Sequence, residues 1–333
     1  MHLTFRTALL ADFMHLPLRT SLLAAAALLA CGGEPDTTDT APSTTDTTAD
    51  PTAAVGTTSS AATTDAPTTA DPSTGPEPTT AGTSSGTQDT ATTADTTGAA
   101  IGCADLPLCE DFEDAADGAP PNPALWTVTA PNCMGAGKLA VASDQAHSGA
   151  RSLRVDGGGG YCDHIFIAHT AALTDLGDQA YGRFYLRLSD PIGQGHVTFL
   201  TMKDTNDSGK DLRMGGQSQI LMYNRESDDA TLPALSPAGI ALSVAPAAGQ
   251  WTCIEFLIDQ AQGHITTWVD DLEVPGLRID AEPTPDIDQQ WANKPDWKPQ
   301  LADIKFGWES YAGQTMTLHL DDLALAAARI GCD

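Results

Sequence analysis

Residues 34–100 lack the side chains from which a hydrophobic core is built. They contain no Lys, Arg, Leu, Ile, Met or aromatic residue and a single Val, whereas Thr occupies 24 of the 67 positions. A segment with so little apolar surface cannot offset the entropy that its backbone loses on ordering. We therefore predict a disordered linker rich in Thr, Ala, Asp and Pro, and place it at residues 31–101.

Basic residues are scarce throughout the 333-residue chain, which has 16 Lys and Arg against 44 Asp and Glu and a formal charge of −28. Ten carboxylates lie in the linker, and residues 1–33 carry a net +1, which leaves −19 for residues 101–333. Nucleic-acid binding requires clustered Lys and Arg that displace phosphate counterions. The composition therefore argues against a nucleic-acid partner.

The apolar run at residues 22–30 is too short to span a bilayer and has the length of a signal-peptide core. It ends in Leu28, Leu29, Ala30 and Cys31, which resemble the lipobox of bacterial lipoproteins. The resemblance implies a signal peptide at residues 1–30 and lipidation of Cys31. We thus expect an extracytoplasmic protein that a lipid holds to a bacterial membrane, at the cell surface or in the periplasm. An ordinary secretory signal with a chance cysteine is the alternative.

Six further cysteines follow the linker, and no two of them form a CxxC motif. An even number in an exported protein predicts disulfides, whereas metal ligation is the weaker alternative because the spacings are irregular. The sequence does not choose among the possible pairings. Because Cys103 and Cys332 bracket the domain, we expect at least one bridge to join its terminal strands. The six are Cys103, Cys109, Cys133, Cys162, Cys253 and Cys332.

Residues 102–333 are predicted to form one all-β domain. Short segments with alternating or continuous apolar residues recur between Gly, Pro, Asn and Asp clusters, and no segment keeps a helical apolar stripe over three turns. This pattern favours a two-sheet antiparallel β-sandwich, or jelly roll, which we expect to be monomeric. The predicted strands are 138–142, 152–155, 165–169, 181–188, 196–202, 212–223, 240–244, 251–259, 264–269, 304–308 and 316–325.

Several catalytic motifs are missing from this domain. It has no GxSxG nucleophile elbow and no HExxH zinc motif, and the glycines at 157–160 lack the Lys-Ser/Thr pair that follows in a phosphate-binding loop. What remains is a set of polar side chains on strands. Strand alternation places His196 on one face of its strand and Val197, Phe199 and Thr201 on the other face. It also predicts one polar face, a candidate sugar-binding groove or simply a solvated surface, that carries Arg213, Gln217, Gln219 and Tyr223.

Short motifs in a fixed order add a resemblance. They are residues 110–113 (EDFE), 147–153 (HSGARSL), 195–196 (GH), 212–217 (LRMGGQ), 251–256 (WTCIEF), 268–270 (WVD) and 320–323 (LDDL). Together they resemble the core domain of the fungal cellulose-induced protein family, over nearly all of residues 103–333. The resemblance implies a concanavalin-A-like jelly roll related to glucuronan and alginate lyases.

The resemblance also implies a cleft. His196, Arg213 and Gln217 match cleft positions shared with the lyases, and Asp229 is a further candidate acid. In a β-elimination from a uronate, Arg213 and Gln217 would neutralise the carboxylate so that the neighbouring C5 proton can be removed. His196, expected to titrate near neutrality, would act as the base or position the carboxylate, and a tyrosine would transfer a proton, with Tyr311 preferred and Tyr223 second.

The acidity of the domain favours an alternative, because a charge of −19 repels an anionic polymer at long range. That alternative is a non-catalytic, calcium-stabilised carbohydrate-binding module, and a structural surface protein without a ligand is a third. The resemblance implies structural Ca²⁺ held by oxygen atoms of Glu113, Ser148, Asp321 and Asp322, whose alternative role is to cap chain ends.

Two pairs of tryptophans differ in their predicted roles. Trp251 and Trp268 lie in apolar strands and are expected in the core. Trp291 and Trp297 lie in a Pro-rich loop, where they either stack on a pyranose ring or pack the loop against the domain.

Overall fold

The computed structural model describes residues 105–170, 173 and 176–332. The predicted signal peptide, Cys31 and the linker lie outside this range and stay predictions. Within it the chain forms fifteen β-strands and one short α-helix, α1 (Pro237–Ile240). No helix in this part of the chain is both long and apolar enough to cross a membrane.

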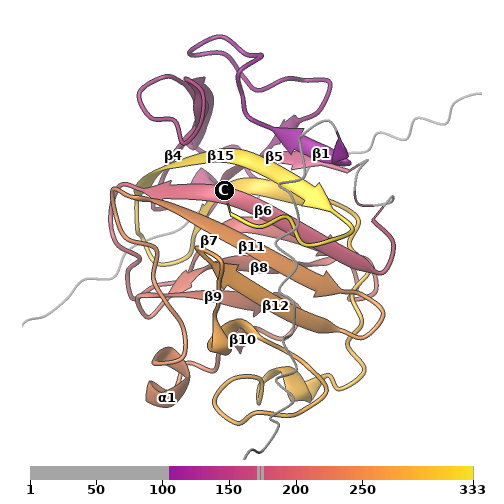
Figure 1. Cartoon of the computed structure of the whole chain (residues 1–333). Coiled ribbons are helices and arrows are strands. Elements are labelled where there is room, and N and C mark those ends of the chain that lie inside the picture. The colour runs from indigo at the N-terminus through magenta and orange to yellow at the C-terminus, as the bar shows by residue number, and fades with distance from the viewer. Residues whose placement is uncertain (1–104, 171–172, 174–175, 333) are drawn as a thin grey trace, which may run out of the picture. The chain divides into compact units, whose positions relative to one another are not determined.

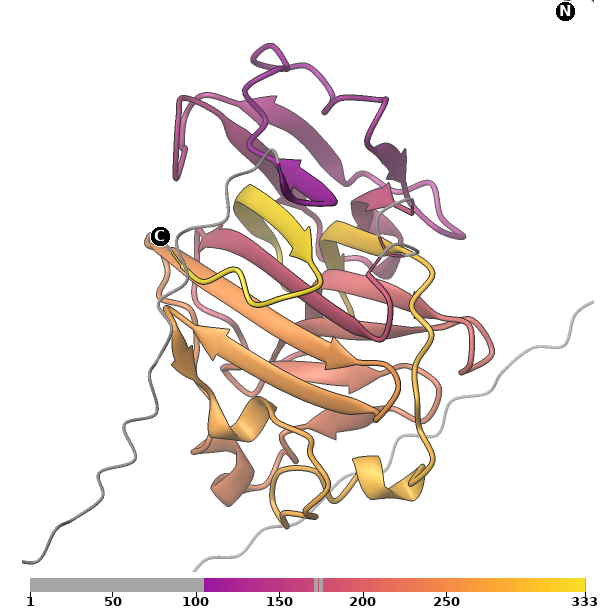
Figure 2. The same ribbon diagram turned by 45° about the vertical axis from the view of Figure 1, so that its right-hand side comes forward.

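The first sheet has the strand order β13-β12-β11-β6-β15-β4-β3, and β1 pairs with the end of β15 beyond β4. Every pairing in it is antiparallel. Figure 2 shows the last strand, in yellow, beside the first, in dark purple. Its members are β1 (Leu108–Glu110), β3 (Lys138–Ala142), β4 (Ser152–Gly157), β6 (Gln179–Leu188), β11 (Trp251–Asp259), β12 (His264–Val269), β13 (Leu272–Glu273) and β15 (Met316–Ala326).

The second sheet, also antiparallel, has the order β10-β9-β8-β7-β14-β5-β2. Figure 1 shows β7, β8 and β9 of this sheet behind β6, β11 and β12 of the first. Its members are β2 (Thr127–Thr129), β5 (Ile165–His169), β7 (Val197–Asp204), β8 (Lys210–Gln217), β9 (Ile220–Arg225), β10 (Ala230–Leu232) and β14 (Ile304–Ser310).

The hydrophobic core lies between the two sheets. Phe184 of the first sheet contacts Phe199 and Phe306 of the second, with ring centroids 6.2 and 5.4 Å apart. The Tyr223 hydroxyl, on β9, forms a 3.1 Å hydrogen bond with the Thr267 hydroxyl of β12. The prediction of a two-sheet antiparallel sandwich is therefore confirmed.

Two predicted strands are wrong. Residues 212–223 form a hairpin, in which Ser218 and Gln219 make the turn at φ of 53° and 66°. The turn changes the phase of alternation, so that Tyr223 points into the core and is fully buried instead of sharing a face with Arg213. Residues 240–244 are not a strand, because α1 begins after Ser236, whose hydroxyl accepts a hydrogen bond from the Gly239 N–H.

The structure pairs Cys133 with Cys162 and Cys253 with Cys332, and Cys109 is also disulfide-bonded. The disulfide framework is thus confirmed for these five cysteines. Cys332 does not provide the expected bridge between the terminal strands, because its partner Cys253 lies on the internal strand β11.

Candidate functional site

A β-bulge in β7 determines which of its side chains lie on the outer face of the second sheet. Thr198 pairs with Gly215 while Leu200 pairs with Met214, so that Phe199 is an extra residue in β7. Phe199 and Leu200 are both fully buried in the core. Beyond the bulge, Thr201 pairs with Arg213 and shares its face, contrary to simple alternation.

A cleft of about 850 Å³ covers this face of the sheet. Its floor follows neighbouring positions on five strands, Arg213, Thr201, Lys305, Ala168 and Thr127, which pair in that order across β8, β7, β14, β5 and β2. Thr201, Ala168 and Thr127 have short side chains, whereas Arg213 at one end of the row and Lys305 in its middle have long, charged ones. The sheet thus provides a groove that crosses its strands.

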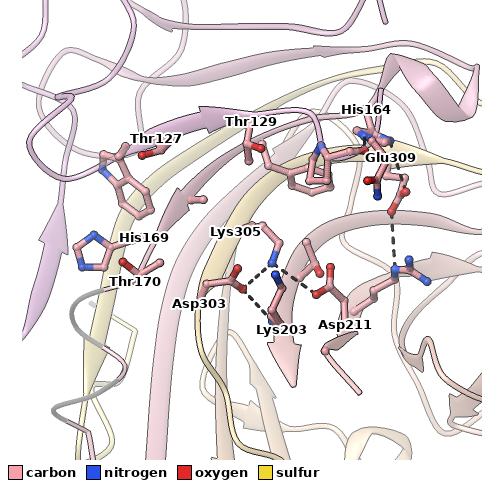
Figure 3. A pocket seen from close by; sticks show the side chains of 18 of the residues that line it. Thr127, Thr129, His164, His169, Thr170, Lys203, Asp211, Asp303, Lys305 and Glu309 are labelled. Atoms are coloured by element: carbon pink, nitrogen blue, oxygen red, sulfur yellow. Dashed lines mark hydrogen bonds and ion pairs between the residues drawn. The ribbon is translucent and has the colours of Figure 1, made fainter. Parts of the chain in front are cut away.

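Opposite charges alternate along the groove, as Figure 3 shows around Lys305. The Lys305 ammonium lies 2.5 Å from Asp303 and 3.6 Å from Asp211. Lys210 pairs with Glu226 at 3.0 Å. Four Lys or Arg side chains and four Asp or Glu side chains line the cleft: Lys203, Lys210, Arg213, Lys305, Asp211, Glu226, Asp303 and Glu309.

Arg213 occupies the centre of this charge pattern. Its guanidinium lies 3.4 Å from Glu226 and 3.7 Å from Glu309, and 5.4 Å from the centre of the Tyr311 ring. Both ion pairs are longer than a good hydrogen bond, and the buried Arg213 Nε has no hydrogen-bond partner. Thr201 Oγ1 and His164 Nδ1, which line the same cleft, are also buried without a partner. Buried polar atoms without partners are rare and concentrate at functional sites.

Glu309 is a buried carboxyl group beside Arg213. Burial raises its pKa, although the Arg213 charge and a hydrogen bond from Tyr311 oppose the shift. His164 Nδ1 lies 3.6 Å from it, and His164 Nε2 hydrogen-bonds the Pro131 carbonyl at 2.8 Å. Because a carbonyl only accepts, His164 Nε2 carries a proton and donates to Pro131.

His196 and Tyr311 lie at the end of the cleft next to Arg213, although neither lines the cleft itself. Their rings stack at 5.1 Å, and Tyr311 is 5.4 Å from Tyr161, which does line it. Burial and the nearby Arg213 lower the pKa of His196 to about 4. His196 is therefore neutral at pH 7 and does not titrate near neutrality, contrary to the prediction. Burial and the charge of Glu309 raise the pKa of Tyr311, so its hydroxyl keeps its proton.

The other predicted cleft residues are farther from the groove. Gln217 is the last residue of β8 and does not line the cleft. Asp229 is exposed after β9, accepts a 2.8 Å hydrogen bond from Asn224, and its charge partly opposes the low pKa of His196. The second-choice Tyr223 is wrong as a cleft residue, because it is buried between the sheets. Of the five predicted catalytic residues, only Arg213 lines the cleft.

The sequence analysis missed Glu309, His164 and Tyr161. A signal was present for Glu309, because alternation in residues 305–309 places Lys305 and Glu309 on the same face. His164 and Tyr161 carried no comparable signal, because they belong to a 3-10 turn (Tyr161–Asp163) and the residue after it. The Cys133–Cys162 disulfide and the contact with Pro131 position that turn at the cleft.

The four predicted calcium ligands surround one loop at the far side of the first sheet. Ser148 Oγ donates to Asp322 at 2.7 Å, and the His147 and Ser148 N–H groups donate to Asp321. Glu113 accepts hydrogen bonds from the N–H groups of Ala150 and Arg151. Nowhere in residues 105–332, apart from the undescribed positions, do three or more His, Cys, Asp or Glu side chains form a group that could hold a metal ion.

Of the two roles predicted for Trp291 and Trp297 the structure shows the packing one, whereas the prediction that Trp251 and Trp268 lie in the core is wrong. Trp291 and Trp297 are 4% and 8% exposed and pack edge to face at 5.3 Å, which holds the Pro-rich loop against the domain. Trp251 and Trp268 are half-buried on the outer face of the first sheet, where the Arg329 guanidinium covers Trp268 at 4.6 Å.

Comparison with known proteins places the domain in a family. The family described as "Polysacc_lyase-like: Cip1-like, core domain" matches residues 111–328. The solved structure "Cellulose induced protein, Cip1" is 38% identical, with a TM-score of 0.62, and the alignment covers 68% of this chain and 100% of that one.

An endo-β-1,4-glucuronan lyase from the fungus Trichoderma reesei matches at 13% identity and a TM-score of 0.36, over 64% of this chain and 94% of that one. No curated protein matches. The resemblance seen in the sequence is confirmed: the chain belongs to the Cip1-like core-domain family of polysaccharide-lyase-like proteins.

Proposed function

We propose that this protein binds a uronate-containing extracellular polysaccharide in the cleft of its second sheet and cleaves it by β-elimination. The observation that carries the proposal is Arg213 on the cleft floor, with a buried Nε that has no hydrogen-bond partner, beside the buried acid Glu309. An arginine fork matches the geometry of a carboxylate, and a protonated carboxyl group donates a further hydrogen bond.

In the reaction, Arg213 and the protonated form of Glu309 hold the uronate carboxylate and stabilise the negative charge that develops there. A base removes the proton from C5, the C4–O bond to the neighbouring sugar breaks, and a C4=C5 double bond forms. Neutral His196, whose ring stacks on Tyr311 beside Arg213, takes the C5 proton. Tyr311, which keeps its hydroxyl proton, gives it to the leaving oxygen.

The second candidate function is a carbohydrate-binding module without catalysis. Two observations favour it: four of the five predicted catalytic residues do not line the cleft, and a His196 with a pKa of about 4 is a weak base. The same groove would then hold a glycan through its threonines, Arg213 and the exposed Tyr161 ring.

We also propose that Cys31 is lipidated and that the linker holds the domain away from the membrane. The disulfides support export, because such bonds persist in oxidising compartments. A Cys31→Ser variant is then released into the soluble fraction. If this variant stays with the membrane as the parent chain does, the anchor is not at this cysteine.

The lyase is tested by the ultraviolet absorbance of the unsaturated uronate when the full chain is incubated with polyuronides. We expect the signal to grow with the parent protein and with the control variant Arg278→Ala, whose side chain is exposed outside the cleft. It disappears in Arg213→Ala. Binding without any absorbance change refutes the lyase and leaves the binding module.

A further inference from the structure

We infer that the cleft selects a glycan in which single 4-linked uronates are separated by neutral sugars, in preference to a polymer built of uronates alone. The inference rests on the proposed function, because it names the substrate class for the same cleft. It comes from the way in which the cations of the groove are already neutralised.

The cations of the groove have carboxylate partners. Lys305 lies between Asp303 and Asp211, Lys210 pairs with Glu226, and Arg213 lies between Glu226 and Glu309. Lys203 is the exception among the described cleft residues: it is exposed on β7 and forms no ion pair with them. A uronate chain that lies along this groove meets as many acids as bases.

The surrounding surface does not compensate for this balance. Residues 101–333 carry −19, and the cleft, with four cations and four acidic groups, adds at most the one positive charge that is left when Glu309 is protonated. Long-range attraction of a polyanion is therefore absent, and screening over about 8–10 Å at physiological salt leaves only local contacts. One uronate carboxylate at Arg213 gains two hydrogen-bond donors, whereas the carboxylates of the adjoining uronates in the same polymer gain none.

Neutral sugars fit the rest of the floor. From Arg213 the row of floor residues, with Lys305 in its middle, crosses four interstrand spacings of about 4.8 Å, or roughly 19 Å, which accommodates several sugar units. Thr127 offers an exposed hydroxyl group to a sugar, and the ring of Tyr161, 45% accessible, offers a stacking surface at the Arg213 end.

The test compares three probes on the full chain: a neutral β-glucan, deacylated gellan, in which glucuronate is spaced by neutral sugars, and polyglucuronate. We expect gellan to bind at least 10-fold more tightly than either of the others, with an affinity that falls only weakly with salt. Tighter binding of polyglucuronate, or a steep salt dependence, overturns the inference.

Two variants test the cause. Glu226→Gln leaves Lys210 without its acid, and Asp211→Asn leaves Lys305 with Asp303 alone. Each variant removes one negative charge from the groove, so each is expected to strengthen polyglucuronate binding roughly 2- to 5-fold relative to gellan. Asp296→Asn removes the same charge from an exposed position outside the cleft and is the matched control. An equal gain in the control shows that net charge, not the groove, sets the preference and overturns the inference.

Absorbance read in the same samples separates the two proposals. Gellan binding without elimination keeps this inference and refutes the lyase, whereas elimination of polyglucuronate in preference to gellan keeps the lyase and refutes this inference. Binding of none of the three probes refutes both.

Discussion

Replacing Arg213 with Met tests the charge balance of the cleft through stability. Methionine keeps most of the apolar stem but leaves Glu309, 5% exposed and 3.7 Å from the lost guanidinium, as a buried uncompensated acid. Removing one partner of a buried ion pair costs about 3–5 kcal/mol. Glu226 is less affected, because Lys210 and the Asp211 N–H still contact it.

The cost depends on pH in a direction that follows from linkage. Loss of the Arg213 charge raises the pKa of Glu309 further above its unfolded value. Below the unfolded pKa, Glu309 is protonated in both the folded and the unfolded state, and its carboxyl group lowers the free energy of unfolding of the variant only a little. As the pH rises to the folded pKa, the penalty grows by about 1.4 kcal/mol per unit and then levels off.

Urea unfolding of the parent and the Arg213→Met variant at pH 5 and pH 8 measures this difference. We expect a clearly larger loss at pH 8, and recovery of the pH-dependent part in the double variant Arg213→Met/Glu309→Gln. Because Arg213 also lowers the pKa of His196, that pKa should rise towards 6.5 in the variant, as NMR titration would show. An equal loss at both pH values, or no recovery in the double variant, refutes the reasoning.

The two described disulfides close loops of different length, 29 residues for Cys133–Cys162 and 79 for Cys253–Cys332. Replacing both cysteines of a bridge with serine should lower the free energy of unfolding by about 3.6 kcal/mol for the first bridge and about 4.5 kcal/mol for the second. Only the first substitution should also weaken glycan binding, since only that bridge adjoins the cleft, and equal binding losses would contradict this. For the proposed calcium site, Ca²⁺ at a hundredfold excess over its Kd should stabilise the protein by about 2.7 kcal/mol. The stabilisation, measured by thermal unfolding in Ca²⁺ and in a chelator, should vanish in Asp322→Asn. If the parent protein unfolds at the same temperature in both, the predicted calcium site is refuted.

The strands were largely predictable from the sequence. Lys138–Ala142, Ile165–His169, Trp251–Asp259 and His264–Val269 have the predicted bounds, because alternating apolar residues between turn-forming ones are a local signal. Family motifs also placed Arg213 at the cleft. The linker and the lipidation of Cys31 concern residues outside the structure and remain predictions from composition and motif alone.

The faces of the strands were decided by the tertiary structure. Strand alternation fails to predict the faces where a β-bulge adds one residue to a strand, as at Phe199. It also fails where the strand ends in a turn, as at Ser218 and Gln219. A bulge depends on how two distant strands pair, so no local pattern reveals it. It placed Thr201 on the groove, and the hairpin placed Tyr223 in the core.

The chemistry of the site depended on the same long-range pairing. The sequence determined that this acidic chain has an all-β domain with Arg213 on one of its strands. Only the fold brought Glu309, 96 positions away, to that arginine and His164 to Glu309, because β8, β7, β14 and β5 follow one another in the sheet. Burial at that meeting point then raised the pKa of Glu309, since the cost of desolvating an ionised group depends on everything packed around it.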